Sequence, residues 1–151
     1  MHIKVDDLTG IEVIKLLQEH HQDMLLHSPP ESVHALDITS LQADDVTFWS
    51  VWVENELAGC GAIKQLSSVH GEIKSMRTSP AFRRQSVAQT LLEFILNESI
   101  KRNYNKVSLE TGSMDAFIPA RNMYEKFGFK YCCPFADYSE DVHSVFMTKQ
   151  L

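Results

Sequence analysis

The sequence has no run of 18 or more apolar residues, so it contains no segment long enough to form a transmembrane helix. It has only three cysteines, Cys60, Cys132 and Cys133, and they lack the C-x-x-C spacing of redox and zinc sites. We interpret them as reduced packing residues, as is usual in the cytosol. With no apolar leader near residue 1, a cytoplasmic protein without a membrane partner is expected.

The sequence also lacks an excess of positive charge. Fourteen Lys and Arg stand against 20 Asp and Glu, which gives a net charge of −6. Non-specific nucleic-acid binding needs a surplus of basic residues, so no nucleic-acid partner is expected. The length of 151 residues and the hydrophobic content of 44% indicate one globular domain over residues 1–151.

What is present is a pattern of strands followed by a strand–helix–strand unit. The expected strands are β-branched or aromatic runs bounded by turn residues, at 3–5, 46–53, 57–66, 72–78, 106–111, 129–134 and 143–148. The expected helices follow apolar periodicity, at about 9–27, within 31–45, at about 86–103, and from Pro119 to Gly128. Thr9 and Glu12 have capping-box spacing at the start of the first helix. The unit 72–111 predicts a parallel strand pair with a right-handed crossover, and hence an α+β fold with a mixed sheet.

The most informative segment is 72–88, which reads as a strand, a basic turn and the start of a helix. A turn that leads into a helix N-terminus directs unpaired backbone N–H groups at one point, and that point attracts phosphate. Arg83 and Arg84 add positive charge there, although a solvated pair of charges on a turn would look the same. Ser86 is expected to cap the helix through its hydroxyl.

Three patterns together resemble the GCN5-related N-acetyltransferase (GNAT) family. Residues 83–88 stand where the family has Arg/Gln-x-x-Gly-x-Gly/Ala, with Ser86 in place of the first Gly. Residues 123–129 resemble its second hallmark, a Tyr on the last helix followed by Gly-Phe. Residues 109–112 end the strand at which the family separates two parallel strands. Phe117 stands where the family often has a cofactor-contacting Asn.

The resemblance implies a three-layer α/β/α fold with a mixed, mostly antiparallel sheet and one splayed parallel pair. It implies acetyl-CoA as co-substrate and no metal. The implied cofactor-binding residues are Met76, Arg77, Thr78, Arg83, Arg84, Gln85, Ser86, Val87 and Ala88, and a backbone N–H of the first three is a candidate oxyanion donor.

The resemblance also assigns two catalytic side chains. Tyr124 is the expected general acid for the CoA thiolate, because an ordinary phenol is protonated at neutral pH. Its periodicity alone would favour a core tyrosine on an amphipathic helix. Glu72 is the expected general base, with a salt bridge to Lys74 as the structural alternative. Glu110 on the neighbouring strand is the second candidate base.

The implied reaction is acetyl transfer to a primary amine of a small molecule or peptide, by direct attack in a ternary complex. His34 and His143 are placed near the acceptor pocket by their position. Residues 137–141 are interpreted as a solvated acidic loop, with attraction of a cationic acceptor as the alternative. In the family, final strands of this kind often pair across dimers, so a homodimer stays an open alternative. Two other functions also remain open: a non-catalytic acyl-CoA sensor or interaction module, and a nucleotide- or phosphate-binding regulatory domain.

Overall fold

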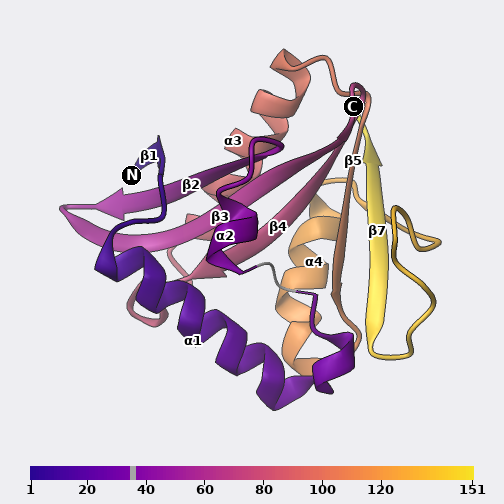
Figure 1. Ribbon diagram of the computed structural model, residues 1–151, viewed down its shortest axis with the longest axis horizontal. Helices are drawn as coiled ribbons and strands as arrows, with labels where there is room; N and C mark the ends of the chain where they lie inside the picture. Colours follow the sequence, from indigo (N-terminus) through magenta and orange to yellow (C-terminus); the bar gives the residue numbers. More distant parts are fainter. Residues whose placement is uncertain (35–36) are drawn as a thin grey trace.

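A seven-stranded mixed sheet forms the centre of the protein, in the order β1-β2-β3-β4-β5-β7-β6 (Figure 1). The computed structural model describes residues 1–34 and 37–151. The strands are β1 His2–Val5, β2 Val46–Val53, β3 Glu56–Ser67, β4 His70–Thr78, β5 Lys106–Gly112, β6 Lys130–Cys132 and β7 Ser144–Gln150. All neighbours are antiparallel except β4 and β5, which are parallel as the strand–helix–strand unit predicts.

Helices cover both faces of this sheet. They are α1 Ile11–His27, η1 Pro30–Ser32, α2 Ile38–Leu41, η2 Pro80–Phe82, α3 Val87–Lys101, η3 Asp115–Phe117 and α4 Ile118–Lys126. One apolar core joins α3 and Tyr124 of α4 to the sheet, and a second joins α1 and α2 to its other face. Figure 1 shows α1 and α2 in front of the sheet and α3 behind it. The predicted three-layer fold is confirmed.

Two helix starts differ from the sequence-based prediction. The capping box at Thr9 is wrong: α1 begins after Gly10, and the Thr9 hydroxyl donates to Asp7 instead. The hydroxyl cap at Ser86 is also wrong, because Ser86 precedes α3 in the left-handed conformation (φ 63°) and makes no side-chain capping bond. An N-cap side chain reaches back to the helix amides from an extended backbone, which Ser86 does not have.

The two ends of the chain complete the sheet. β1 forms one edge, and β7 inserts between β5 and β6, so the short β6 forms the other edge. The region 31–45, predicted as one short helix plus loop, contains η1 and α2, and residues 35–36 of it lie outside the described residues. In the described part of the chain, no helix is both long and apolar enough to cross a bilayer.

Candidate active site

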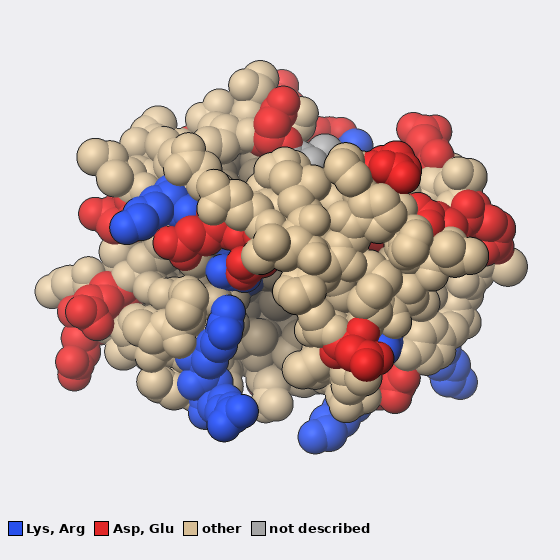
Figure 2. Space-filling model, turned by 90° about the horizontal axis from the view of Figure 1, so that it is seen from below, with Lys and Arg blue, Asp and Glu red and all other residues tan. Residues whose placement is uncertain are grey.

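The site begins where the parallel strands separate. β4 and β5 pair only from His70–Lys106 to Glu72–Ser108, and beyond that point they diverge (Figure 1). A cavity of about 130 Å³ lies beyond the last pair. Both strands line it, together with α1, α4 and the β6–β7 loop. The face seen from below in Figure 2 is hollowed near its centre, with Lys and Arg side chains beside the hollow.

The first turn of α3 presents backbone amides that have no partner within the helix. Arg84 and Ser86 both have left-handed backbones, at φ 62° and 63°, on either side of Gln85. Alternating backbone handedness of this kind forms a concave nest of N–H groups that binds anions. Arg83 and Arg84 are exposed. Phosphate binding at this turn stays a prediction, and these backbone conformations and charges are compatible with it.

A β-bulge distorts β4 along the cavity. Ser75 has a left-handed backbone (φ 56°), and the pairing with β3 shifts between Cys60 and Ala62. The Cys60 thiol donates to the Ser75 carbonyl at 3.4 Å. Because β5 has left the sheet edge here, β4 from Ile73 onward pairs with no strand of the described chain on that side. Backbone groups of Met76 and its neighbours thus face an open strand edge.

Arg77 connects the end of β4 to α1. Its Nη1 lies 2.6 Å from Oδ2 of Asp23, and its side chain is only 11% exposed. Its Nε atom is buried and has no hydrogen-bond partner among the described residues. Burial, with the Arg77 charge as a second cause, lowers the pKa of the nearby His20 to about 4, so that imidazole is neutral at pH 7.

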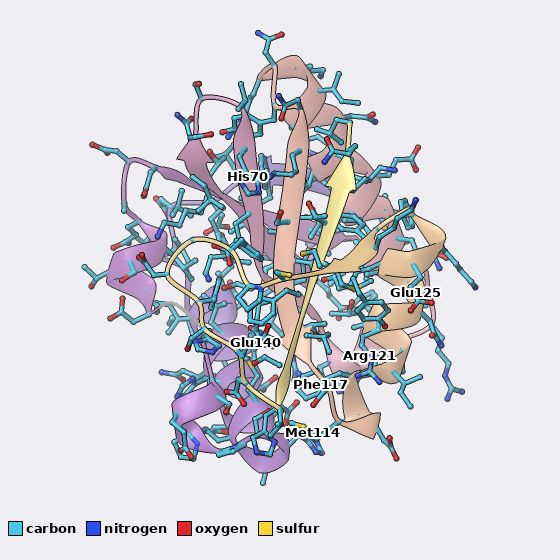
Figure 3. The ribbon with its side chains drawn as sticks, turned by 90° about the vertical axis from the view of Figure 1, so that its right-hand side faces the viewer. His70, Met114, Phe117, Arg121, Glu125 and Glu140 are labelled. Atoms are coloured by element: carbon cyan, nitrogen blue, oxygen red, sulfur yellow. The ribbon has the colours of Figure 1, made fainter. Side chains whose placement is uncertain are left out.

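Tyr124 lies on α4 at the edge of the cavity. It is buried, its ring packs edge-to-face on Phe129 at 5.6 Å, and burial raises the pKa of its phenol well above the usual value of 10. Arg121 fixes α4 to the end of β5, because its Nη1 donates to the carbonyls of Gly112 at 2.7 Å and Met114 at 3.0 Å. Figure 3 shows Arg121 beside this connection. Tyr124 is therefore held at the strand gap in its protonated form.

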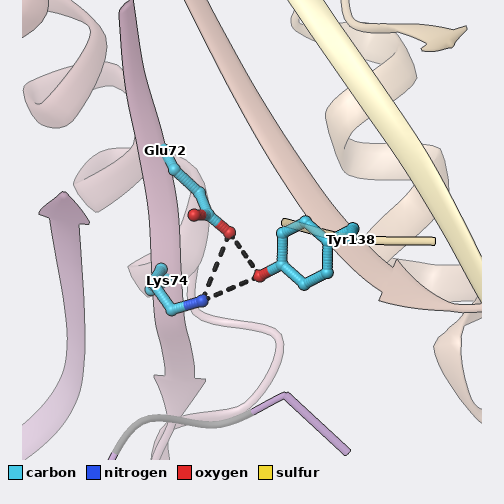
Figure 4. Close-up of polar contacts among 3 residues, drawn as sticks. All are labelled: Glu72, Lys74 and Tyr138. Atoms are coloured by element: carbon cyan, nitrogen blue, oxygen red, sulfur yellow. Dashed lines mark hydrogen bonds and ion pairs between the residues drawn. The ribbon is translucent and has the colours of Figure 1, made fainter. Parts of the chain in front are cut away.

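Glu72 lies on the cavity wall within a closed polar triangle (Figure 4). Its Oε2 accepts from the Tyr138 hydroxyl at 2.6 Å and from Lys74 Nζ at 3.2 Å, and Lys74 also donates to the Tyr138 oxygen at 2.9 Å. The Glu72 and Lys74 side chains are 4% and 9% exposed, so the pair lies inside the protein and not at its rim.

The β6–β7 loop, residues 133–143, supplies a cavity residue that sequence analysis missed. Tyr138 reaches β4 from this loop, and its ring packs on His34 at 5.0 Å and Phe135 at 5.2 Å. Asp141 accepts from the Ser32 hydroxyl of η1. The interpretation of residues 137–141 as a solvated loop is therefore wrong for Tyr138. The only sequence signal that this loop packs against the protein was its pair of aromatic residues, Phe135 and Tyr138, in an otherwise polar segment.

The second carboxylate, Glu110, projects into the same cavity from β5. Burial, strengthened by the charges of Glu72 and Asp141, raises the pKa of Glu110 to about 7.

Phe117 also lines the cavity, with its ring over Gly112. His34 lies in the lining as its position predicted, whereas His143 does not. Among the described residues, no group of three or more His, Cys, Asp or Glu side chains is placed to hold a metal ion.

Comparison with known proteins identifies the family. Residues 12–129 match the Acetyltransferase (GNAT) family. The chain belongs to this family. It is 59% identical over 151 residues, all of both chains, to the uncharacterized N-acetyltransferase YsnE of Bacillus subtilis (strain 168). It is 48% identical over 149 residues, 99% of this chain and 94% of the other, to the N-acetyltransferase YedL of Escherichia coli (strain K12). The predicted family and the predicted enzyme class, an N-acyltransferase, are confirmed.

A solved structure supports the same fold. A GNAT family acetyltransferase from Elizabethkingia anophelis with acetyl-CoA bound superposes with a TM-score of 0.72 at 17% identity. The superposition covers 99% of this chain and 97% of that one.

Proposed function

We propose that this enzyme transfers the acetyl group of acetyl-CoA to a primary amine of a small molecule or peptide, by direct attack in a ternary complex. The observation that carries the proposal is the cavity between the diverging β4 and β5. Tyr124 lines it together with two carboxylates, Glu72 and Glu110. One cavity thus contains a proton donor and proton acceptors of the kinds that acyl transfer to an amine requires.

Acetyl-CoA supplies an activated acyl group, and this chain offers groups suited to hold it. The nest formed around Arg84 and Ser86 suits the pyrophosphate, with the amides of residues 83–88 as donors. The unpaired edge of β4 at Met76, Arg77 and Thr78 suits the pantetheine arm and the thioester oxygen. The buried Nε of Arg77, which has no hydrogen-bond partner in the described part of the chain, is a further donor beside this edge.

Tyr124 is the proposed general acid for the departing thiolate. Its raised pKa keeps the phenol protonated at neutral pH. The proton acceptor is one of the two cavity carboxylates, and the sequence pattern predicts Glu72. The Cys60 thiol is an unsuitable acyl carrier, because burial raises its pKa to about 12.

Thiol release from acetyl-CoA tests the proposal. The acceptors are a panel of spermidine, tyramine, free amino acids, a kanamycin-type aminoglycoside and a short peptide. We expect turnover with at least one amine. Tyr124→Phe should lower kcat by about 10²–10⁴-fold while acetyl-CoA binding is kept. The matched control is Tyr104→Phe, which removes a hydroxyl that bonds Gln65 away from the cavity and should leave kcat unchanged.

Two outcomes would contradict the proposal. Acetyl-CoA binding without turnover on any amine would favour the acyl-CoA sensor. Binding of ATP in preference to acetyl-CoA would favour a nucleotide-binding regulatory domain.

A further inference from the structure

The cavity between β4 and β5 already contains a primary amine, the side chain of Lys74. Lys74 lines this cavity together with Tyr124, and no other lysine of the described chain does so. Its side chain is only 9% exposed, whereas lysine side chains ordinarily extend into water. A buried primary amine in a cavity suited to acetyl transfer to amines needs a physical explanation.

Two partners hold the Lys74 amine in place (Figure 4). Its Nζ donates to Oε2 of Glu72 at 3.2 Å and to the hydroxyl oxygen of Tyr138 at 2.9 Å. The Nζ atom also lies 5.6 Å from the centre of the Tyr138 ring. An ammonium group has three N–H donors, and in the described part of the chain these are the partners of two of them. The nitrogen is therefore fixed at the cavity wall and has one N–H left for a further partner.

Lys74 is also close to the part of β4 that is proposed to hold the thioester. Met76 is two residues further along, where β4 pairs with no strand of the described chain on the β5 side. Two residues of a strand span about 7 Å, and the left-handed Ser75 between them bends the strand at a bulge. The flexible four-carbon stem of lysine lets its nitrogen reach a thioester bound at Met76. An amine held beside an acyl group reacts far faster than the same amine in solution.

We propose that Lys74 is itself an acetyl acceptor: when no external amine is bound, its Nζ takes the acetyl group from acetyl-CoA in the same cavity. This inference rests on the proposed function. The Lys74 ammonium first releases one proton to solvent. The neutral nitrogen then forms a bond to the thioester carbon, and the C–S bond breaks. The nitrogen gives up a second proton while the thiolate takes one up, so the products are acetyl-lysine, CoA as the free thiol and one proton in solvent.

Lys101 on α3 is a matched control within the same protein. Its Nζ also lies 3.2 Å from a carboxylate oxygen, Oε1 of Glu98, but its side chain is 73% exposed. Acetyl-CoA free in solution reacts with the amines that it can reach, so chemical acetylation should modify Lys101 before Lys74. Acetyl transfer inside the cavity reverses this order.

Peptide mass spectrometry measures the order directly. Wild type is incubated with trideuteroacetyl-CoA without an amine acceptor, and the labelled fraction is followed over time at Lys74 and Lys101. We expect Lys74 to be labelled at least about tenfold faster, at a rate that does not change when the protein is diluted. Excess CoA should slow the labelling of Lys74 and leave that of Lys101 unchanged. Lys74→Arg keeps a positive charge beside Glu72 and should lose the fast label while acetyl-CoA binding is kept.

The outcomes separate this inference from the proposed function. Labelling of Lys101 as fast as that of Lys74, or labelling of Lys74 that excess CoA does not slow, would overturn the inference. Turnover on an amine of the panel with no label on Lys74 would also overturn it, and the proposed function would stand. Fast, CoA-sensitive labelling of Lys74 supports the inference even if no amine of the panel reacts. Absence of acetyl-CoA binding would overturn both.

Discussion

The Tyr138 hydroxyl donates a hydrogen bond of 2.6 Å to Oε2 of Glu72, although the two residues are 66 positions apart in the sequence. This bond connects the β6–β7 loop to the strand that forms the cavity wall. The Lys74 ammonium donates to both atoms of this bond, Oε2 of Glu72 and the hydroxyl oxygen of Tyr138. The three side chains therefore form a closed network in which each polar contact supports the others.

Tyr138→Phe removes one member of this set without removing the ring. Glu72 then loses a donor inside the protein, and we expect the free energy of unfolding to fall by about 1–3 kcal/mol. Chemical denaturation measures this change. Tyr131→Phe is the matched control, because the Tyr131 hydroxyl bonds Glu125 at an exposed site and its loss should change stability by no more than about 0.5 kcal/mol. Equal effects of the two substitutions would contradict the buried triangle.

Ser86→Gly tests the left-handed position before α3. A residue with a Cβ at φ 63° is strained, by about 1–2 kcal/mol, and glycine relieves this strain. We expect the variant to be more stable by about 1 kcal/mol and to bind acetyl-CoA at least as tightly. Glu93→Gly, in the exposed middle of α3, should instead destabilise the protein by about 0.5–1 kcal/mol. A loss of stability in Ser86→Gly would show that the serine makes a contact that offsets the strain.

Gly112→Ala tests the contact between β5 and Phe117. A Cβ at Gly112 would collide with the Phe117 ring, so the ring must move from the cavity wall. Overpacking of this kind costs about 1–3 kcal/mol. The second substitution Phe117→Ala should recover part of that loss, which a double-mutant cycle measures. An additive cycle would argue against the contact.

The titration of Glu110 gives a pH dependence of stability with a definite sign. Its pKa is about 7 in the folded protein, against about 4.3 in an unfolded chain. Between these values the native state holds a proton that the unfolded state has released. The contribution of Glu110 is therefore fully present below about pH 4 and is lost as the pH rises through 7. The free energy of unfolding of Glu110→Gln should fall less over this range than that of wild type or Glu93→Gln. Parallel curves for Glu110→Gln and wild type would contradict the raised pKa.

The sequence predicted those parts of the fold and site that depend on local patterns. The crossover from β4 through α3 to β5 follows from apolar periodicity and turn residues between 72 and 111. The turn at residues 83–88 before α3 and the position of Tyr124 on α4 before Gly128 follow from the family resemblance. The handedness of Ser86 could also have been inferred, because the family has glycine there, but the hydroxyl suggested an ordinary cap.

The remaining features depend on contacts between distant segments. Glu72 and Lys74 are close in sequence, and their pairing was foreseen, but their burial depends on Tyr138 arriving from another part of the chain. The same applies to Asp141 and Ser32, which are 109 residues apart. No local periodicity marks such a contact. The raised pKa of Glu110 depends on these same segments closing over β5.

The most direct test of the account is calorimetric titration with acetyl-CoA, beside ATP, for wild type and Arg84→Glu. The exposed substitution Lys15→Glu on α1 controls for the change in net charge. We expect acetyl-CoA to bind wild type and Lys15→Glu with a dissociation constant in the micromolar range, as is common for enzyme substrates. Arg84→Glu should lose this binding, because a carboxylate would then face the anion at the start of α3, and ATP should not bind. Absence of acetyl-CoA binding to wild type, or equal binding to Arg84→Glu, would contradict the site described between β4, β5 and α3.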